Sequence, residues 1–331
     1  MSFYGVNVLI ESSLDSLLSL LKKDFSYFVV ESLPTSTMGL ALTIKKENYQ
    51  GKIPQNLVAI SQSQTCLTYE ENHLRYNDYY GEALAIFNYA QESCEIFGED
   101  ESRLHEIVYL IILSRVGLMH DKSGIHRLHA FGVTYHDVNL IGMMPMKGGK
   151  STLFMNLLKN PAIEVLSDDS PLIDQQGKIL PFPIRLGLQE KPEDYTSYTM
   201  KRKIYGEKFL IDIADIQNKV GSEKPYTVLF QGRRSTYEQC QIIHCSKIKM
   251  LIHLFKNLIV GLGLPMVIEY FLMTGLEDKI EKVKITWLRV LSSLHLLMKS
   301  DCYEFYLTSN PDKNTQAILE FLDNHFPREA P

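Results

Sequence analysis

A glycine-bearing turn followed by a lysine and a hydroxyl residue stands in the middle of the chain, in the stretch MPMKGGKSTL at 144–153. Consecutive backbone N–H groups in such a turn can surround phosphate oxygens, and the start of the following helix adds partial positive charge. Lys150 would then reach the terminal phosphates of a nucleotide, and the hydroxyl of Ser151 would hold Mg²⁺. Gly148 and Gly149 supply backbone torsions that other residues resist. The stretch therefore predicts a nucleotide-binding loop.

The loop departs from the strict phosphate-loop pattern at its first position, where Met144 replaces the usual glycine. Pro145 also removes one N–H donor and stiffens the turn. Lys147 adds a cation that could contact phosphate or point into water, and we include Lys147 and Thr152 among the candidate nucleotide-binding residues. The alternative is a turn that only caps a helix, so the loop by itself leaves nucleotide binding open.

Two adjacent aspartates, Asp168 and Asp169, end a short β-like run that follows the loop. An acidic pair at the end of a strand beside a phosphate loop can hold Mg²⁺ and accept a proton from an attacking hydroxyl. Adjacent carboxylates also repel each other, so we expect a raised pKa for one of them, which suits a general base. Alone, the pair would be read as a solvated turn. Its position after the loop favours a metal site shared with Ser151.

These segments together resemble the HPr kinase/phosphorylase group, which shares a catalytic core with phosphoenolpyruvate carboxykinase. In that group a histidine followed by a small residue precedes the loop, as His129 does here in LHA at 128–130. The run SDD at 167–169 matches the acidic pair of the group. The run PFPIR at 181–185 is similar to a segment of HPr-kinase-related proteins. The resemblance covers about residues 126–190.

The resemblance implies a phosphotransferase that uses ATP and Mg²⁺ and modifies a hydroxyl. It implies that Lys150 and Ser151 bind the ATP phosphates and the metal ion. Asp168 or Asp169 would bind the metal and activate the acceptor hydroxyl, and His129 would lie near that carboxylate and tune it. Arg185 becomes a candidate for contacting phosphate or acceptor, its alternative being a salt-bridged arginine. Without the resemblance, His129 would be read as a core histidine.

The expected acceptor is the serine hydroxyl of a peptide or small protein, with a small hydroxylated molecule as the next option. Because two loop residues depart from the family pattern, a nucleotide-binding regulatory pseudokinase that transfers no phosphate is the alternative. Phosphorolysis of a phosphoserine, the reverse chemistry of the family, would use the same site.

The bulk composition is that of an ordinary globular chain of 331 residues, with 45% hydrophobic and 22% charged residues. A net charge of −5 gives no sign of a nucleic-acid-binding face. The first residues lack a basic segment, and the five cysteines form no C-x-x-C motif, so we expect a cytoplasmic protein with reduced thiols. The apolar run at 250–273 contains charged residues and predicts two buried helical pieces. We therefore expect neither nucleic acid nor a membrane as partner.

The pattern around the candidate residues predicts an α/β (α+β) chain in three regions. These are an N-terminal α+β region at 1–122, a nucleotide-binding core with a mixed sheet of the HPr-kinase type at 123–246, and a mostly helical C-terminal region at 247–331. The third region includes one late strand, in CYEFYLT. It also has apolar residues at helical spacing, which we expect to be buried, Trp287 in particular: Val283, Trp287, Leu288, Leu291, Leu294 and Met298.

Overall fold

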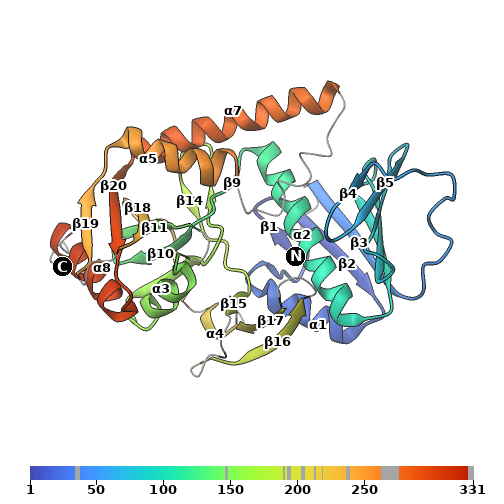
Figure 1. The fold of residues 1–331 in the computed structure, drawn as a ribbon, viewed down its shortest axis with the longest axis horizontal. Helices are drawn as coiled ribbons and strands as arrows, with labels where there is room; N and C mark the ends of the chain where they lie inside the picture. Colours follow the sequence, from blue (N-terminus) through green and yellow to red (C-terminus); the bar gives the residue numbers. More distant parts are fainter. Residues whose placement is uncertain are drawn as a thin grey trace. The chain divides into compact units, whose positions relative to one another are not determined.

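The mixed α/β class predicted for the chain is confirmed by its computed structural model (Figure 1). The structure describes residues 1–33, 38–145, 148–188, 191, 195–202, 206–211, 214–217, 219–235, 239–261 and 276–326. It divides the chain into two compact units. Unit 1 comprises Met1–Met119 with Arg185–Asp215, and unit 2 comprises His120–Ile184 with Ile216–Pro331.

This division differs from the three predicted regions. The first boundary falls inside α2 (Glu101–Ser123), close to the predicted one at 122. Residues 185–215, predicted to be part of the core region, belong to unit 1, and residues 247–331 join the core in unit 2. The unit to which a segment belongs depends on which distant strands it pairs with. Local hydrophobic periodicity does not reveal this pairing.

Unit 1 is built on an eight-stranded mixed sheet with the order β1-β2-β3-β8-β7-β6-β5-β4. Its strands are β1 (Ser2–Phe3), β2 (Val6–Ser12), β3 (Met38–Lys46), β4 (Ser61–Gln62), β5 (Leu67–Glu71), β6 (Leu74–Asp78), β7 (Ala83–Asn88) and β8 (Ser93–Gly98). Its short helices are α1 (Asp15–Asp24) and η1 (Ser26–Phe28). A second, three-stranded sheet consists of β15 (Leu186–Leu188), β17 (Gly206–Ile211) and β16 (Ser197–Arg202), and α4 (Ala214–Gln217) follows it.

Unit 2 contains a six-stranded mixed sheet with the order β12-β10-β11-β18-β20-β19. Its strands are β10 (Phe131–Tyr135), β11 (Val138–Met143), β12 (Ile163–Ser167), β18 (Tyr226–Arg234), β19 (Gln241–His244) and β20 (Ser300–Leu307). A small sheet joins β14 (Ile179–Leu180), β13 (Leu172–Ile173) and β9 (His126–Arg127). The helices are α3 (Lys150–Leu157), α5 (Lys247–Leu254), the π-helical turn η2 (Phe255–Ile259), α7 (Leu276–Met298) and α8 (Pro311–His325). Strand β20 confirms the predicted late strand.

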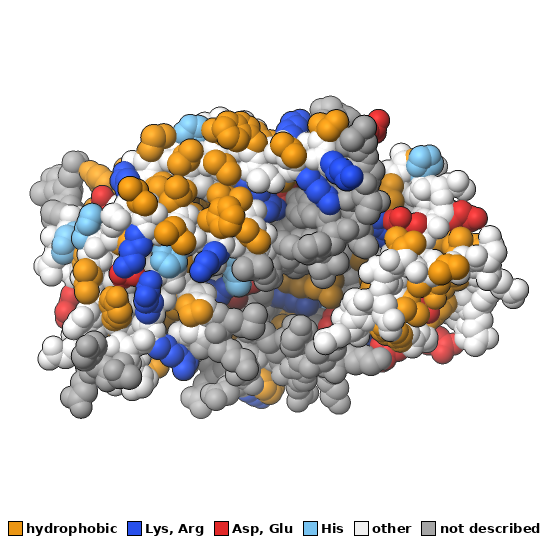
Figure 2. Space-filling model, turned by 45° about the horizontal axis from the view of Figure 1, so that its top comes forward, with side chains coloured by type: hydrophobic (Ala, Val, Ile, Leu, Met, Phe, Trp, Pro, Cys, Tyr) orange, Lys and Arg blue, Asp and Glu red, His pale blue; other side chains and the backbone are white. Residues whose placement is uncertain are grey.

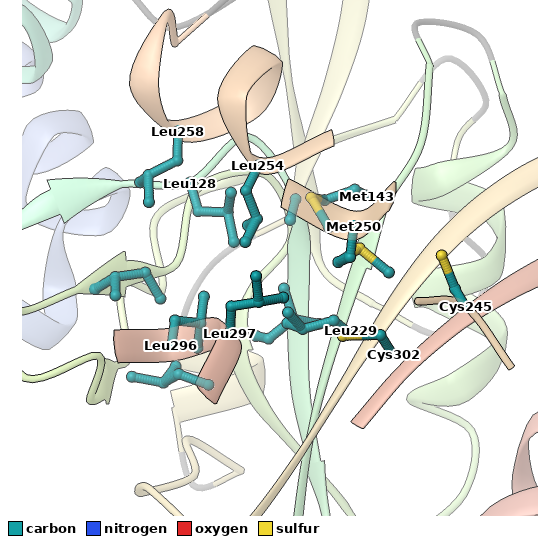
Figure 3. Packing of buried hydrophobic residues seen from close by; sticks show 14 of the residues in the cluster. Leu128, Met143, Leu229, Cys245, Met250, Leu254, Leu258, Leu296, Leu297 and Cys302 are labelled. Atoms are coloured by element: carbon teal, nitrogen blue, oxygen red, sulfur yellow. The ribbon is translucent and has the colours of Figure 1, made fainter. Parts of the chain in front are cut away.

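Helices cover both faces of the six-stranded sheet in unit 2. On one face, α5 and α7 contribute leucine and methionine side chains that pack against Met143 of β11 and Leu229 of β18 (Figure 3). On the other face, the ring of Phe230 packs against Phe321 of α8 at a centroid distance of 5.6 Å. Every residue of β10 and β11 is buried, as expected for central strands covered on both sides.

Local sequence signals explain where several elements begin. The side chain of Asn310 accepts hydrogen bonds from the N–H groups of Asp312 and Lys313, and Pro311 occupies the first turn of α8. The hydroxyl of Ser246 accepts from the N–H of Lys249 at the start of α5. Among the described residues, no helix has both the length and the apolar character needed to cross a membrane.

The expectation that Trp287 lies in the core is wrong. Its side chain is 61% exposed, and Val283 beside it on α7 is exposed as well. The inner face of α7 instead carries polar groups with partners: Arg289 donates to both carboxylate oxygens of Asp121, and the hydroxyl of Ser293 donates to the carbonyl of Arg289. Because these polar side chains are satisfied inside unit 2, the strongest apolar row of the helix is left on the outside.

Candidate functional site

The carboxyl ends of four strands meet at one edge of the six-stranded sheet. Strands β11, β18 and β20 are parallel, and β12 runs in the same direction because both β11 and β12 pair antiparallel with β10. In open α/β sheets, ligands bind beyond this edge. The loop at 144–149 follows β11 and the acidic pair follows β12, while His129 precedes the antiparallel β10. The topology therefore brings the predicted catalytic segments to one side of the sheet.

The loop after β11 is closed by a short backbone turn. The N–H of Gly148 donates to the carbonyl of Pro145 at 2.8 Å, and a Cβ added to Gly148 would lie 2.7 Å from that oxygen. Gly149 adopts a left-handed φ of 96° and caps α3. The amides of the first helical residues, among them Ser151, have no intrahelical acceptor, which suits them to an anion. Lys147 falls outside the described residues.

The methionine that replaces the first glycine of the loop is packed into the interior. Met144 is only 4% exposed, and its side chain lies against the backbone of Gly232 in β18, where an added Cβ would come within 2.8 Å of two Met144 carbons. The Met144 side chain therefore packs into the space beside β18.

The turn that carries the two aspartates is held by the residue before them. Ser167 is fully buried, and its hydroxyl accepts a hydrogen bond from the N–H of Ser170 at 3.0 Å, which closes the turn around Asp168 and Asp169. The N–H of Ala130 donates to the carbonyl of Asp169 at 3.2 Å. This backbone contact ties the residue that follows His129 to the acidic turn.

Three side chains predicted from separate motifs meet at one carboxylate. The ammonium group of Lys150 forms an ion pair with Oδ1 of Asp169, and Nε2 of His129 lies 3.4 Å from the same oxygen. The Lys150 and His129 side chains are mostly covered, whereas that of Asp169 is 48% exposed. A cation, an imidazole and a partly accessible carboxylate therefore stand together beyond the sheet edge.

The pKa of Asp169 is shifted in the direction opposite to the one expected from repulsion within the acidic pair. Loss of surrounding water raises this pKa, but the hydrogen bond from His129 and the charge of Lys150 outweigh that effect and hold it well below its usual range. The carboxylate is consequently ionised at neutral pH. The expectation of a raised pKa does not hold for Asp169, because its nearest partners are cationic or hydrogen-bond donors.

Two residues at this end of the sheet, Asn257 and Gln231, do not belong to any of the sequence motifs. The N–H of His129 donates to the carbonyl of Asn257 at 3.0 Å, so the π-helical turn η2 holds the histidine segment; such turns are frequent at functional sites. Gln231 of β18, the register partner of Met143, is 7% exposed, and its side-chain oxygen accepts no hydrogen bond from any residue that the structure describes. A polar residue within the apolar run VLFQG was the available signal for Gln231.

The oxygen donors of Ser151, Asp168 and Asp169 are chemically suited to Mg²⁺, which favours one or two carboxylates together with substrate phosphates. Both aspartates are partly accessible, as is Ser151. No group of three or more His, Cys, Asp or Glu side chains that could hold a metal ion occurs in the described part of the chain. The described residues therefore form no complete metal cage, and these oxygen donors would hold a Mg²⁺ ion only together with phosphate oxygens.

Arg185 pairs with a buried carboxylate of its own unit. It belongs to unit 1, where its guanidinium donates to the buried carboxylate of Asp24 at 3.0 Å and lies 3.4 Å from the ring centroid of Tyr109. His105 lies 2.6 Å from the same carboxylate, and the hydroxyl of Tyr198 also contacts it. These contacts support the salt-bridged alternative for Arg185.

Comparison of the sequence with protein-family models finds no match, and comparison with the curated proteins finds none either. The resemblance to the HPr kinase group therefore depends on the motif residues themselves.

Proposed function

We propose that the chain is an ATP- and Mg²⁺-dependent phosphotransferase with a phosphate-loop core of the HPr kinase type. Its acceptor would be a hydroxyl, with serine of a peptide or small protein as the preferred class. The observation that carries the proposal is the meeting of Lys150, Asp169 and His129 beyond the carboxyl ends of β11 and β12.

The loop and α3 supply the phosphate-binding part of this proposal. The left-handed Gly149 and the tight turn at Gly148 place backbone N–H groups at the start of the helix, where an anion is stabilised. In the structure the Lys150 ammonium is held by Asp169. Nucleotide phosphates would compete for this cation, so binding ATP is expected to release the Asp169 carboxylate for its own role.

The acidic turn supplies the acceptor side. An ionised Asp169 can accept a hydrogen bond from a hydroxyl and orient its oxygen toward the phosphate, and positioning of this kind accounts for much of the catalysis in phosphoryl transfer. His129 contacts the same carboxylate oxygen as Lys150 and helps to keep the pKa of Asp169 low. When bound to Ser151, Asp168 and Asp169, Mg²⁺ would neutralise charge on the transferred phosphate.

A regulatory nucleotide-binding protein without phosphotransfer is the second candidate. The ion pair between Lys150 and Asp169 favours it, because a carboxylate that stays paired cannot orient an acceptor. Pro145 favours it as well, since it cannot donate a backbone hydrogen bond to phosphate.

The two candidates are separated by a transfer assay with ATP labelled at the γ-phosphate and a pool of serine-containing peptides. Wild-type protein is expected to label peptides in a Mg²⁺-dependent reaction, and Asp169→Asn is expected to lower the rate about 10²–10⁴-fold, as loss of a catalytic acid–base group does. The Asn variant should still bind ATP. Binding of ATP without any labelling in the wild type would favour the regulatory candidate, and the absence of ATP binding would reject both.

A further inference from the structure

Exposed apolar side chains gather over the outer face of α5, η2 and α7 in unit 2 (Figure 2). The helices pack against each other, and each contributes a row at helical spacing. Single exposed apolar residues need no explanation, but a contiguous group on one face marks an interaction site. We call this group the α5–α7 face; it consists of Ile248, Ile252, Phe255, Ile280, Val283, Trp287, Leu294 and Met298.

The helices do not need this face to hold their own positions. Their inner sides are buried in the core cluster of unit 2, through Met250, Leu254 and Leu258 on one side and Leu296 and Leu297 on the other (Figure 3). Because the inner rows already anchor both helices, the outer rows are available to a second surface.

Basic side chains predominate around most of the α5–α7 face, and the acidic residues of α7, Glu277, Asp278 and Glu281, are confined to its N-terminal end beside Ile280. Residues 247–259 and 282–299 contain six lysines and neither aspartate nor glutamate, although the whole chain has a net charge of −5. One of these lysines, Lys249, is paired with Glu304 at 2.6 Å. Lys256 and Lys284 are exposed and form no ion pair with any described residue. From Val283 onward the face is therefore apolar with a cationic border, and this part complements an apolar surface of negative charge.

A parallel coiled-coil pair with a second copy of the chain is disfavoured by lysines beside the apolar row of α7. The residues Ile280, Val283, Trp287, Val290 and Leu294 follow the 3–4 spacing of a two-stranded coiled coil. Two of the positions that flank this row are Lys279 and Lys284. In a parallel pair they would face each other across the interface, where like charges destabilise the contact and direct the helix to a different partner.

We infer that the α5–α7 face binds the surface of a lipid bilayer that contains anionic lipids. The apolar side chains would enter the boundary between headgroups and acyl chains, and the lysines would extend toward the lipid phosphates. Tryptophan is enriched at this depth of a bilayer, which suits the exposed position of Trp287. The contact is peripheral and departs from the expectation that the protein has no membrane partner. It is independent of the proposed phosphotransfer.

Trp287 is the chain's single tryptophan, so its fluorescence reports on this face without a label. The full chain is titrated with vesicles of phosphatidylcholine alone and with vesicles that also contain phosphatidylglycerol. The anionic vesicles are expected to shift the emission to shorter wavelength and to carry the protein upward in a flotation gradient. Both effects should weaken as salt is raised, because exposed charges are screened.

Variants locate the contact on the molecule. Val283→Glu and Lys284→Gln both change exposed positions, and both are expected to lower the fraction of protein bound to anionic vesicles. The effect of Val283→Glu should be at least about tenfold, because this variant places a charge in the apolar contact. Val58→Glu alters another strongly exposed valine, which belongs to unit 1, and should bind like the wild type.

Three results would overturn the inference. The first is an unchanged emission and no flotation with anionic vesicles. The second is an emission shift that depends on protein concentration without vesicles and accompanies a doubled mass in light scattering, which would assign the face to a second copy. The third is equal loss of vesicle binding in Val58→Glu and Val283→Glu, which would place the contact elsewhere.

Discussion

Lys150, the first residue of α3, and Asp169, in the turn after β12, form an ion pair across the carboxyl edge of the six-stranded sheet. The pair joins the two motifs that the sequence offers for phosphate and metal binding. His129 contacts the same carboxylate oxygen, so the three side chains meet at one atom.

Met144→Ala is expected to destabilise the protein by about 2–5 kcal/mol, because it removes a buried side chain that fills the space over Gly232. Urea unfolding followed by circular dichroism measures the change. Met298→Ala, at an exposed position, is the matched control and should stay within about 0.5 kcal/mol of the wild type. Equal effects of the two substitutions would show that Met144 is not packed as described.

Gly149→Ala is expected to destabilise the protein by about 1–3 kcal/mol through backbone strain alone, since φ is 96° and no atom lies within 4 Å of the added Cβ. Gly149→Asn should recover part of the loss, because asparagine tolerates this conformation better than alanine does. The melting temperatures of both variants measure these changes in stability. Stability unchanged in the alanine variant would mean that the loop has another conformation.

Asp121→Asn tests the buried charges beneath α7 in unit 2. It leaves Arg289 without its carboxylate partner and should cost about 3–5 kcal/mol at neutral pH. Burial raises the pKa of Asp121, but Arg289 and the hydrogen bond from His126 hold it well below its usual range. The stability that the ionised carboxylate provides is therefore complete above the unfolded-state pKa, about 3.9, and is lost as the pH falls below it toward the folded-state pKa.

The corresponding measurement is the free energy of unfolding of wild type and Asp121→Asn from neutral pH into the acid range. The difference between the two proteins should be constant above about pH 5 and shrink as the pH falls further. A difference that grows on acidification would have the wrong sign for a depressed carboxyl pKa and would contradict the assignment.

The convergence of Lys150 and Asp169 could be predicted because the loop and the acidic pair follow each other closely in the chain, whereas the place of His129 followed only from the resemblance to the HPr kinase group. The loop has glycines before a lysine, and the acidic pair ends a strand. Strand order then places both at one edge of the sheet. The contribution of Asn257 could not be predicted, because a π-helical turn has no signature in the local pattern. Gln231 is marked as a polar residue in an apolar run, but the parallel register that sets it beside Met143 cannot be read from that run.

The positions of Arg185 and Trp287 show where local pattern is insufficient. Arg185 follows the PFP run, yet it pairs with Asp24 of unit 1, more than a hundred residues away in the chain. Trp287 belongs to the most apolar row of α7, yet the row that enters the core contains Arg289 and Ser293. Side-chain partners contributed by distant segments decided both outcomes, and spacing along the chain does not reveal such partners.

The most direct test of the proposed nucleotide site is a calorimetric titration of a non-hydrolysable ATP analogue with Mg²⁺ into wild type and Lys150→Met. The wild type should bind, and the variant should bind at least about tenfold more weakly, because it loses the charged group that meets the terminal phosphates. Lys159→Met, which changes an exposed lysine just after α3, should bind like the wild type. Equal binding by the wild type and Lys150→Met, or no binding by the wild type, would contradict the placement of nucleotide phosphates at this loop.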